Sequence, residues 1–135
     1  MRLKRAVLLS ALALQAIVVS LAVQAHDEHN GTLWSLVQLI ANPDKYDGHE
    51  VRVVGYVRLE FEGNAIYLHR EDYEKGLTAN ALWLDTRSCN SRASGKPFTK
   101  GYAVVEGTFS STNHGHMGMF SGAIVRITRC DHYNE

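Results

Sequence analysis

Apolar and polar residues alternate with a period of two from Val51 onward, which is the pattern of a half-buried β-strand. The apolar set that we predict to face the core consists of Val51, Val53, Gly55, Val57, Leu59 and Phe61. Apart from Val54, the set that we predict to face outward is polar or aromatic: Arg52, Tyr56, Arg58, Glu60 and Glu62. A glycine inside a strand is typical of a bulge or a barrel corner, and Gly55 takes that place here.

Four further strands are predicted after this one. They span residues 65–69, 80–86, 102–109 and 120–130. We expect a hairpin turn at residues 62–64, in which Gly63 takes a positive φ, and a short helix or loop at residues 70–76 that Gly76 ends. The remaining connections, residues 87–100 and 110–118, are predicted loops.

A helical period precedes the first strand. Leu33, Leu36, Val37 and Ile40 recur at the spacing of one helix face, and Thr32 is placed to cap that helix. The helix is expected to end before Pro43, because the residue before proline avoids the helical region, and residues 44–48 are a predicted turn.

The expected fold is therefore mainly β: a five-stranded OB-like barrel with an N-terminal helix and a short helix between strands 2 and 3. An immunoglobulin-like sandwich fits less well, since it needs about seven strands.

The first 25 residues have the pattern of a secretory signal peptide. Three basic residues lie before an apolar run at residues 6–25, which ends in the small-residue site Val-Gln-Ala. We predict cleavage after Ala25, a single OB-like domain at residues 26–135, and a periplasmic or secreted location. The alternative is an uncleaved membrane anchor, because the apolar run is nearly as long as the roughly 20 residues that cross a bilayer.

Charge argues against a nucleic-acid partner. Loss of Arg2, Lys4 and Arg5 would take Lys plus Arg from 14 to 11 against 14 Asp plus Glu, a net charge of −3. Binding to a phosphate backbone needs a basic surface, which this composition does not supply.

Cys89 and Cys130 are the two cysteines of the chain. An even number of cysteines in an exported protein predicts a disulfide bond, and the absence of a C-x-x-C spacing disfavours a redox or metal-thiolate role. The chain-entropy model gives about 4 kcal/mol for a loop of about 40 residues.

The stretch LIANPDKYDGHEVRVVGYVRLEFEGNAIYLHREDYEKGLTANALWLD, together with VVEGTFSSTNHGHMGMFSG, resembles a group of small uncharacterised exported bacterial proteins. The resemblance extends from Ser35 to Thr128. It implies a helix plus an OB-like barrel and export, and it implies no activity and no catalytic residues.

One loop carries residues that could bind a metal: His114, His116, Met117 and Met119. Imidazole and thioether ligands together suit copper, and thioether sulfur selects Cu(I). In compartment, size and ligand types the chain is similar to small periplasmic copper and silver carriers with OB-like barrels, although those place their ligands on strands. The alternative, which we favour, is a tight hairpin in which Met117 and Phe120 plug a barrel end and the imidazoles bond backbone groups.

Three weaker patterns remain. His26 and His29 could chelate copper near the new N-terminus, although such tails are usually only flexible. Paired carboxylates can do acid–base work, but a solvated face beside Arg52 and Arg58 is the commoner arrangement for Glu60, Glu62 and Glu106. An exposed stacking surface for sugars or peptides could be formed by Trp34, Tyr46, Tyr56, Tyr67 and Trp83, of which we expect the two tryptophans in the core.

The sequence therefore favours a non-enzymatic, exported binding or interaction module without a cofactor. Its expected partner is an unidentified envelope protein or small ligand, and it meets a membrane only if the signal is uncleaved. The alternative function is soft-metal binding, of copper or silver, by residues 114–119.

Overall fold

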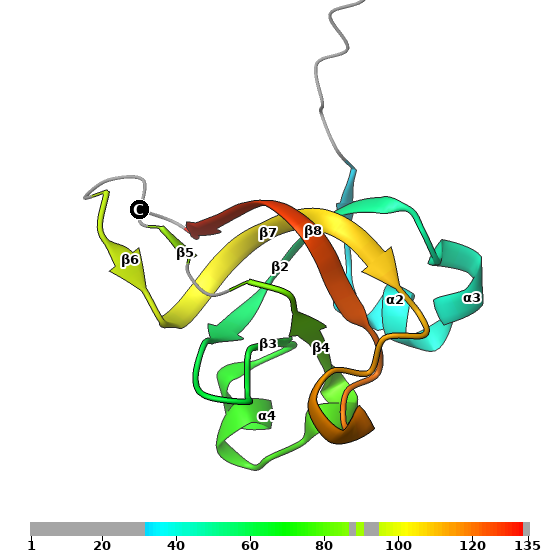
Figure 1. Cartoon of the computed structure of the whole chain (residues 1–135), viewed down its shortest axis with the longest axis horizontal. Coiled ribbons are helices and arrows are strands. Elements are labelled where there is room, and N and C mark those ends of the chain that lie inside the picture. Colours follow the sequence, from blue (N-terminus) through cyan, green and yellow to red (C-terminus); the bar gives the residue numbers. More distant parts are fainter. Residues whose placement is uncertain (1–31, 87–88, 91–94, 134–135) are drawn as a thin grey trace, which may run out of the picture. The chain divides into compact units, whose positions relative to one another are not determined.

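The computed structural model describes residues 32–86, 89–90 and 95–133 (Figure 1). The chain divides into two units, Met1–Asn30 and Gly31–Glu135, and every described residue belongs to the second. The predicted signal peptide, His26 and His29 lie outside the described residues. Within those residues, no helix combines the length and the hydropathy needed to cross a membrane.

Five strands form a closed barrel, which confirms the predicted OB-like fold. They are β2 (Glu50–Arg58), β3 (Ala65–Tyr67), β4 (Ala81–Leu84), β7 (Lys100–Ser110) and β8 (Ala123–His132). β2 pairs antiparallel with both β3 and β7, β3 with β4, and β7 with β8. A parallel pairing of β4 with β8 closes the ring.

Three short strands lie beside this ring. β1 (Leu33–Trp34) runs parallel to β2, where we expected the first turn of the helix. β5 (Cys89–Asn90) and β6 (Pro97–Phe98) pair with each other inside the region predicted to be a loop. Both are only two residues long, too short to leave a periodic pattern in the sequence.

The core of the barrel follows the predicted alternation along β2. Val51, Val53, Val57 and Leu59 are buried. Gly55 is required by packing, because a Cβ atom there would lie 2.6 Å from the backbone oxygen of Tyr67. The prediction for Phe61 is wrong: its side chain is 92% exposed, because β2 ends at Arg58 and Phe61 lies in the turn that follows.

The turn between β2 and β3 also differs from the prediction. The positive φ belongs to Glu62, at 59°, and not to Gly63. Gly63 is instead close to the side chain of Glu60, whose Cγ would lie 2.8 Å from an added Cβ. Glu62, a residue with a side chain, therefore takes the strained conformation that was expected of the glycine.

The predicted N-terminal helix forms, with a different boundary and face. It is α2 (Leu36–Ala41), capped by Ser35 in a capping box with Gln38, so Thr32 is not the cap. Leu36 and Leu39 are its buried residues; Val37 is 54% exposed and Leu33 lies in β1. A second short helix, α3 (Pro43–Tyr46), replaces most of the predicted turn, because proline is well suited to the first position of a helix.

The helix predicted between the second and third barrel strands is α4 (Arg70–Glu74), followed by Gly76 at a φ of 67°. Asp72 is buried in it and accepts hydrogen bonds from the backbone of His69 and the amide of Asn80. The bond from His69 caps α4, and the bond from Asn80 joins α4 to the 3-10 turn Thr78–Asn80.

A second, smaller apolar cluster lies on the outer face of the barrel. Its buried members are Ala65, Tyr67, Ala81 and Phe120. Tyr67 and Ala81 are direct partners in the β3–β4 pairing, and Phe120 comes from the connection between β7 and β8. In Figure 1 this connection and α4 lie beside β3 and β4, so part of the outer face is covered by the chain itself.

The predicted disulfide is present. Cys89 in β5 is bonded to Cys130 in β8, with a Cα–Cα distance of 4.7 Å and a sequence separation of 41. Both cysteines are buried against the main core. The bond fastens the segment between β4 and β7 to the last strand.

Candidate binding surfaces

Tyrosine rings form a continuous chain of contacts on the outer face of the barrel. Tyr56 in β2 is the register partner of both Tyr67 in β3 and Tyr102 in β7, so the three side chains leave the sheet on the same face. Tyr73 from α4 lies against this row. The ring centroids are 5.6 Å apart for Tyr56–Tyr102, 6.0 Å for Tyr56–Tyr73 and 5.6 Å for Tyr67–Tyr73.

The members of this chain differ in exposure. Tyr67 is 5% exposed, and burial raises the pKa of its hydroxyl. It therefore packs beneath the more exposed rings and is not itself part of the accessible surface. Tyr102 is 39% exposed, and Tyr56 and Tyr73 are half-buried. We call Tyr56, Tyr73 and Tyr102 the tyrosine face.

Arg58 and Glu60 form an ion pair at one side of the tyrosine face. The Arg58 guanidinium lies 5.6 Å from the Tyr73 ring centroid, a cation–π arrangement. Its Nε donates to Glu60 at 3.0 Å, and this hydrogen bond raises the pKa of Arg58. The Tyr73 hydroxyl donates to the same Glu60 oxygen at 3.4 Å. The face thus combines ring surfaces with oriented polar groups.

The loop with the predicted metal-binding residues, 114–119, packs on the barrel through its first residues. The Nδ1 of His114 is 2.8 Å from the Phe120 carbonyl oxygen, as the hairpin interpretation expected of an imidazole. A Cβ added to Gly115 would lie 2.6 Å from the Trp83 ring, so glycine lets the backbone rest on that ring. Trp83 also packs on Phe120, with ring centroids 5.6 Å apart.

The prediction that Met117 plugs the barrel is wrong. Met117 is 81% exposed and Met119 is 48% exposed, whereas Phe120 is buried in the outer cluster. A strand alternation does not apply here, because residues His116–Gly118 form a tight 3-10 turn. Within it Met117 has a φ of 52°, and its side chain faces solvent.

Two loop tips meet through a contact between an imidazole and a carboxylate. The Nε2 of His116 is 3.5 Å from a carboxylate oxygen of Glu62, which joins the β7–β8 connection to the β2–β3 turn. Glu62 and Met117 both have positive φ, a conformation that costs a residue with a side chain about 1–3 kcal/mol and clusters at functional sites. We call Phe61, Glu62, His116, Met117 and Met119 the loop edge.

The four predicted metal-binding residues have different surroundings. His114 bonds a carbonyl, His116 contacts Glu62, and both methionines are exposed. In the part of the chain that the structure describes, no group of three or more His, Cys, Asp or Glu side chains is placed to hold a metal ion. Sequence spacing could not identify Glu62, because it reaches His116 only through the fold.

The three glutamates considered for acid–base chemistry are separated by their partners. Glu60 contacts Arg58 and Glu62 contacts His116. Glu106 accepts from Arg52 at 2.7 Å and from Arg129 at 3.0 Å. Burial alone would raise the pKa of Glu106, but the hydrogen bonds from the two arginines outweigh it and the pKa is lowered.

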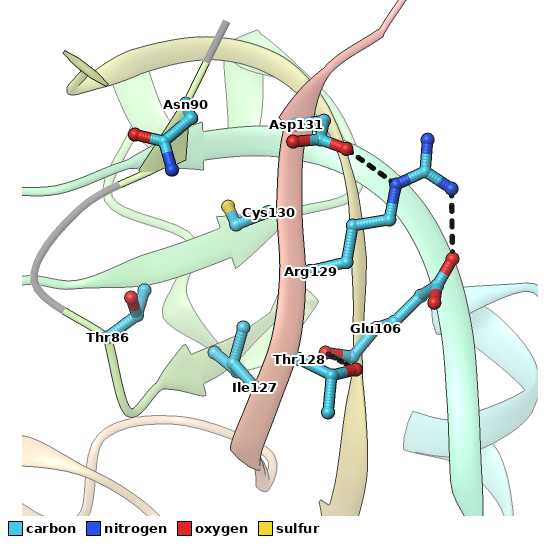
Figure 2. A pocket seen from close by; sticks show the side chains of 8 residues that line it. All are labelled: Thr86, Asn90, Glu106, Ile127, Thr128, Arg129, Cys130 and Asp131. Carbon is cyan, nitrogen blue, oxygen red and sulfur yellow. Dashed lines mark hydrogen bonds and ion pairs between the residues drawn. The ribbon is translucent and has the colours of Figure 1, made fainter. Parts of the chain in front are cut away.

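A polar pocket of about 500 Å³ lies along β8 (Figure 2). Its lining includes Thr86, Asn90, Ile127 and Thr128. Arg129 projects from the other side of the strand in Figure 2, where it also donates to Asp131 at 2.7 Å. The pocket could not be predicted from the sequence pattern, because its walls come from separate segments of the chain.

The other predicted stacking residues do not extend the tyrosine face. Trp34 and Tyr46 pack on each other, with centroids 4.9 Å apart, against the main core. Trp83 is half-buried under the β7–β8 connection. The sequence interpretation included Tyr56 and missed Tyr73 and Tyr102. The register partner Tyr102 carried a usable signal, since it lies in a strand with alternating residues.

Comparisons of the chain with protein-family models, curated proteins and solved structures found no match.

Proposed function

We propose that this protein is a non-enzymatic, exported binding or interaction module that contacts its partner through the tyrosine face. The supporting observation is the unbroken ring contact from Tyr73 through Tyr56 to Tyr102, with Arg58 held over Tyr73. Tyrosine and arginine are enriched in the energetically dominant centres of protein interfaces. Tyrosine rings held in place by neighbours also lose little conformational entropy on binding.

A non-enzymatic role agrees with the arrangement of the carboxylates. Each of the three candidate glutamates contacts its own arginine or histidine. General acid–base catalysis instead uses groups with opposed protonation states that converge on one reacting position. The partner we propose is an envelope protein or a small ligand, and not a nucleic acid.

Export is supported by the basic and apolar N-terminal sequence and by the disulfide. Disulfide bonds persist mainly in oxidising compartments such as the bacterial periplasm or the cell exterior. We therefore place the protein in the periplasm or outside the cell, released from its signal segment after Ala25.

Affinity capture with surface variants tests this proposal. The full chain, tagged at its C-terminus, is produced in its own cells, and envelope proteins retained by it are quantified by mass spectrometry. We expect Tyr102→Ser and Tyr73→Ser to lose a partner that the wild type and Phe61→Ser retain. Phe61 is a suitable control because it is an exposed aromatic residue on the loop edge. Equal retention by all four proteins would contradict the proposal.

The loop edge supports a second candidate, soft-metal binding. The observation that favours it is the His116–Glu62 contact, which brings an imidazole and a carboxylate together, and the exposed Met117 follows His116 directly in the chain. Titration of Cu(I) against a competing chelator tests it. If the loop edge is the site, the affinity for Cu(I) should fall at least about tenfold, or 1.4 kcal/mol, in both His116→Ala and Met117→Ala. Unchanged affinity in both variants would exclude this loop as the site.

A further inference from the structure

The outer face of β2 and β7 carries its side chains in ordered rows. The two strands pair antiparallel along the whole of β2, and register partners in such a ladder point to the same face. From one end to the other, the four outward pairs are Arg58–Lys100, Tyr56–Tyr102, Val54–Val104 and Arg52–Glu106. We call these four pairs the outer rows. At about 3.3 Å per residue they extend roughly 20 Å along the strands, so the tyrosine face continues into a longer surface.

The row at one end of this surface carries a positive charge. Arg58 is paired with Glu60, so these two groups balance each other. Lys100 is exposed, and no hydrogen bond or ion pair joins its side chain to another residue that the structure describes. Its charge is therefore available to a carboxylate of the partner, a surface pairing that contributes modestly to affinity and more to orientation.

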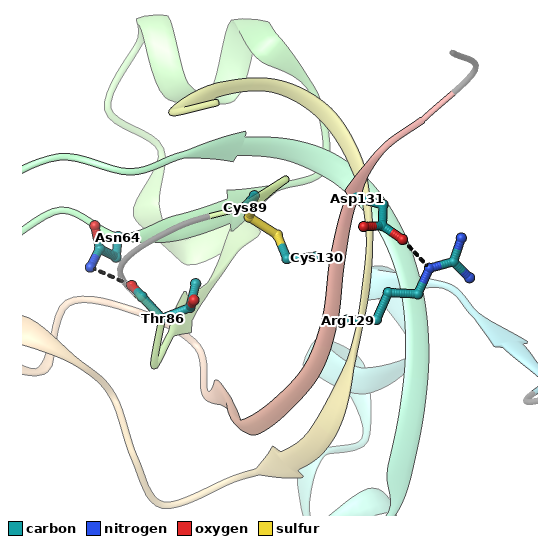
Figure 3. The surroundings of a disulfide bond; sticks show 6 residues. All are labelled: Asn64, Thr86, Cys89, Arg129, Cys130 and Asp131. Atoms are coloured by element: carbon teal, nitrogen blue, oxygen red, sulfur yellow. Dashed lines mark hydrogen bonds and ion pairs between the residues drawn. A yellow bond between two sulfur atoms is a disulfide. The ribbon is translucent and has the colours of Figure 1, made fainter. Parts of the chain in front are cut away.

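The row at the other end has no net charge. Arg52 and Arg129 both donate to Glu106, and Arg129 donates to Asp131 as well. Figure 3 shows Arg129 and Asp131 on the side of β8 away from the buried Cys130, which is the outer side. Two arginines and two carboxylates thus bond one another. The surface is basic at the Lys100 end and neutral at this one.

The rings between the two ends form an angular surface. The Tyr102 ring plane lies at 74° to that of Tyr56, and the Tyr73 ring plane lies at 35° to it. The half-buried Val54 and Val104 form the next row and are apolar. Rings at such angles make no common flat platform for the successive sugar rings of a glycan. They fit a narrow ligand with projecting apolar rings of its own.

Side chains, and not main-chain groups, are what this surface offers to a partner. Each residue of β2 has a register partner in β7, and the ladder between the two strands uses their backbone groups. The hydroxyls of Tyr56 and Tyr102 make no hydrogen bond with another described residue, so they can donate to a ligand. Proline suits such a surface, because it has no amide N–H that needs an acceptor and its carbonyl oxygen can accept.

We propose that the outer rows bind a proline-rich segment of the partner polypeptide, in the polyproline II conformation, with an acidic residue beside Lys100. This inference rests on the proposed function and names the chemistry of the partner at the same surface. Polyproline II rises about 3.1 Å per residue, so residues two apart lie about 6 Å apart along its axis. The centroid distances of 5.6 Å for Tyr56–Tyr102 and 6.0 Å for Tyr56–Tyr73 match that repeat. Aromatic-lined surfaces bind such segments, whose preformed conformation lowers the entropic cost of binding.

A random library of 12-residue peptides displayed on phage provides the probe. It is panned against the protein purified, with its disulfide intact, from cells that express the full chain. Enriched peptides are synthesised, and their affinities are measured by fluorescence anisotropy. The same protein is applied to an array of bacterial envelope glycans.

The variants are Tyr102→Ser and Lys100→Glu, each with a matched control. Phe61→Ser removes an exposed aromatic ring from the loop edge, and Lys45→Glu makes the same charge change on the exposed surface of α3. Circular dichroism verifies that all four variants are folded.

We expect the enriched peptides to be rich in proline, with Asp or Glu at one end. Their affinity should fall at least tenfold for Tyr102→Ser and at least threefold for Lys100→Glu, and stay unchanged for Phe61→Ser and Lys45→Glu. Replacing the acidic residue of the peptide with lysine should restore binding to Lys100→Glu, because the charges of the pair are then exchanged.

The inference would be overturned if the enriched peptides lack proline, if no peptide is enriched, or if Tyr102→Ser binds them like the wild type. Glycan binding that is lost in Tyr102→Ser would also overturn it, by assigning the surface to a carbohydrate. Affinity capture keeps the two failures apart. If Tyr102→Ser and Tyr73→Ser still lose an envelope partner, the tyrosine face is the binding surface and only the proline-rich chemistry is wrong.

Discussion

Tyr56 and Tyr102 are direct partners across β2 and β7, and their rings meet edge to face with centroids 5.6 Å apart and planes at 74°. This geometry is favourable for aromatic pairs and contributes about 0.5–1.5 kcal/mol beyond buried area. The two rings are therefore held in place before any partner arrives, which is what a binding surface of low entropic cost needs.

The buried and the exposed tyrosines of this row should differ in how much their replacement destabilises the protein. We expect Tyr67→Ala to lower the free energy of unfolding by about 3 kcal/mol or more, because a large buried side chain is removed. Tyr102→Ala should cost about 1 kcal/mol, since its ring is 39% exposed. Urea denaturation of both variants measures the difference. A larger loss for Tyr102→Ala would place Tyr102 in the structural core and remove it from the binding surface.

The register of β2 predicts a similar contrast between neighbours. Val57 is fully buried, so Val57→Ala should destabilise the protein by at least about 1 kcal/mol. Arg58 lies on the outer face, and Arg58→Ala should cost under about 1 kcal/mol even though its ion pair is lost. Chemical denaturation under identical conditions gives both values, and the reverse ranking would refute this register.

Glu106 should make stability depend on pH. Its pKa is lowered in the fold from the usual 4.5, so the ionised form contributes stability above pH 4.5. That contribution is lost as the pH falls through the lowered pKa of the folded state. At pH 7 we expect Glu106→Gln to be about 1–2 kcal/mol less stable than the wild type, with the gap closing at low pH.

Urea midpoints of the two proteins between pH 2 and pH 7 measure this gap. Glu74→Gln is the control, because Glu74 pairs with Arg70 on the exposed surface of α4. A gap that stays constant with pH would show that the Arg52–Glu106–Arg129 contacts do not lower this pKa.

In the β7–β8 connection, replacing the exposed Met117 should leave the stability almost unchanged, whereas replacing the buried Phe120 should lower it. Met117→Ala should alter the free energy of unfolding by no more than about 0.5 kcal/mol, because Met117 is 81% exposed. Phe120→Ala should cost about 3 kcal/mol or more, since Phe120 is buried in the outer cluster. Thermal melts with and without added Cu(I) separate packing from metal effects. A loss of about 2 kcal/mol in metal-free Met117→Ala would restore the plug interpretation.

Much of the fold could be predicted because β2 is buried on one face only. A period of two over Val51–Leu59 fixes both strand and register, and five such signals limit the architecture to a small barrel. The disulfide followed from the cysteine count alone. Phe61 was misplaced because alternation contains no information on where a strand ends.

The surfaces were harder to predict because they depend on contacts between distant segments. Tyr73 reaches the barrel from α4, and Glu62 meets His116 only when two loops converge. The local sequence pattern instead favoured residues 114–119 as the candidate site, because His and Met are concentrated there. Composition identified that loop, but the turn at Met117 decided which side chains it exposes.

Site-specific photocrosslinking tests whether the tyrosine face is the surface that contacts the partner. A benzophenone amino acid is placed at position 102, 73, 61 or 117 of the full chain, and the intact cells are irradiated. We predict a discrete covalent adduct from positions 102 and 73 and none from positions 61 and 117. Adducts from 61 or 117 with none from 102 and 73 would exclude the tyrosine face and assign binding to the loop edge.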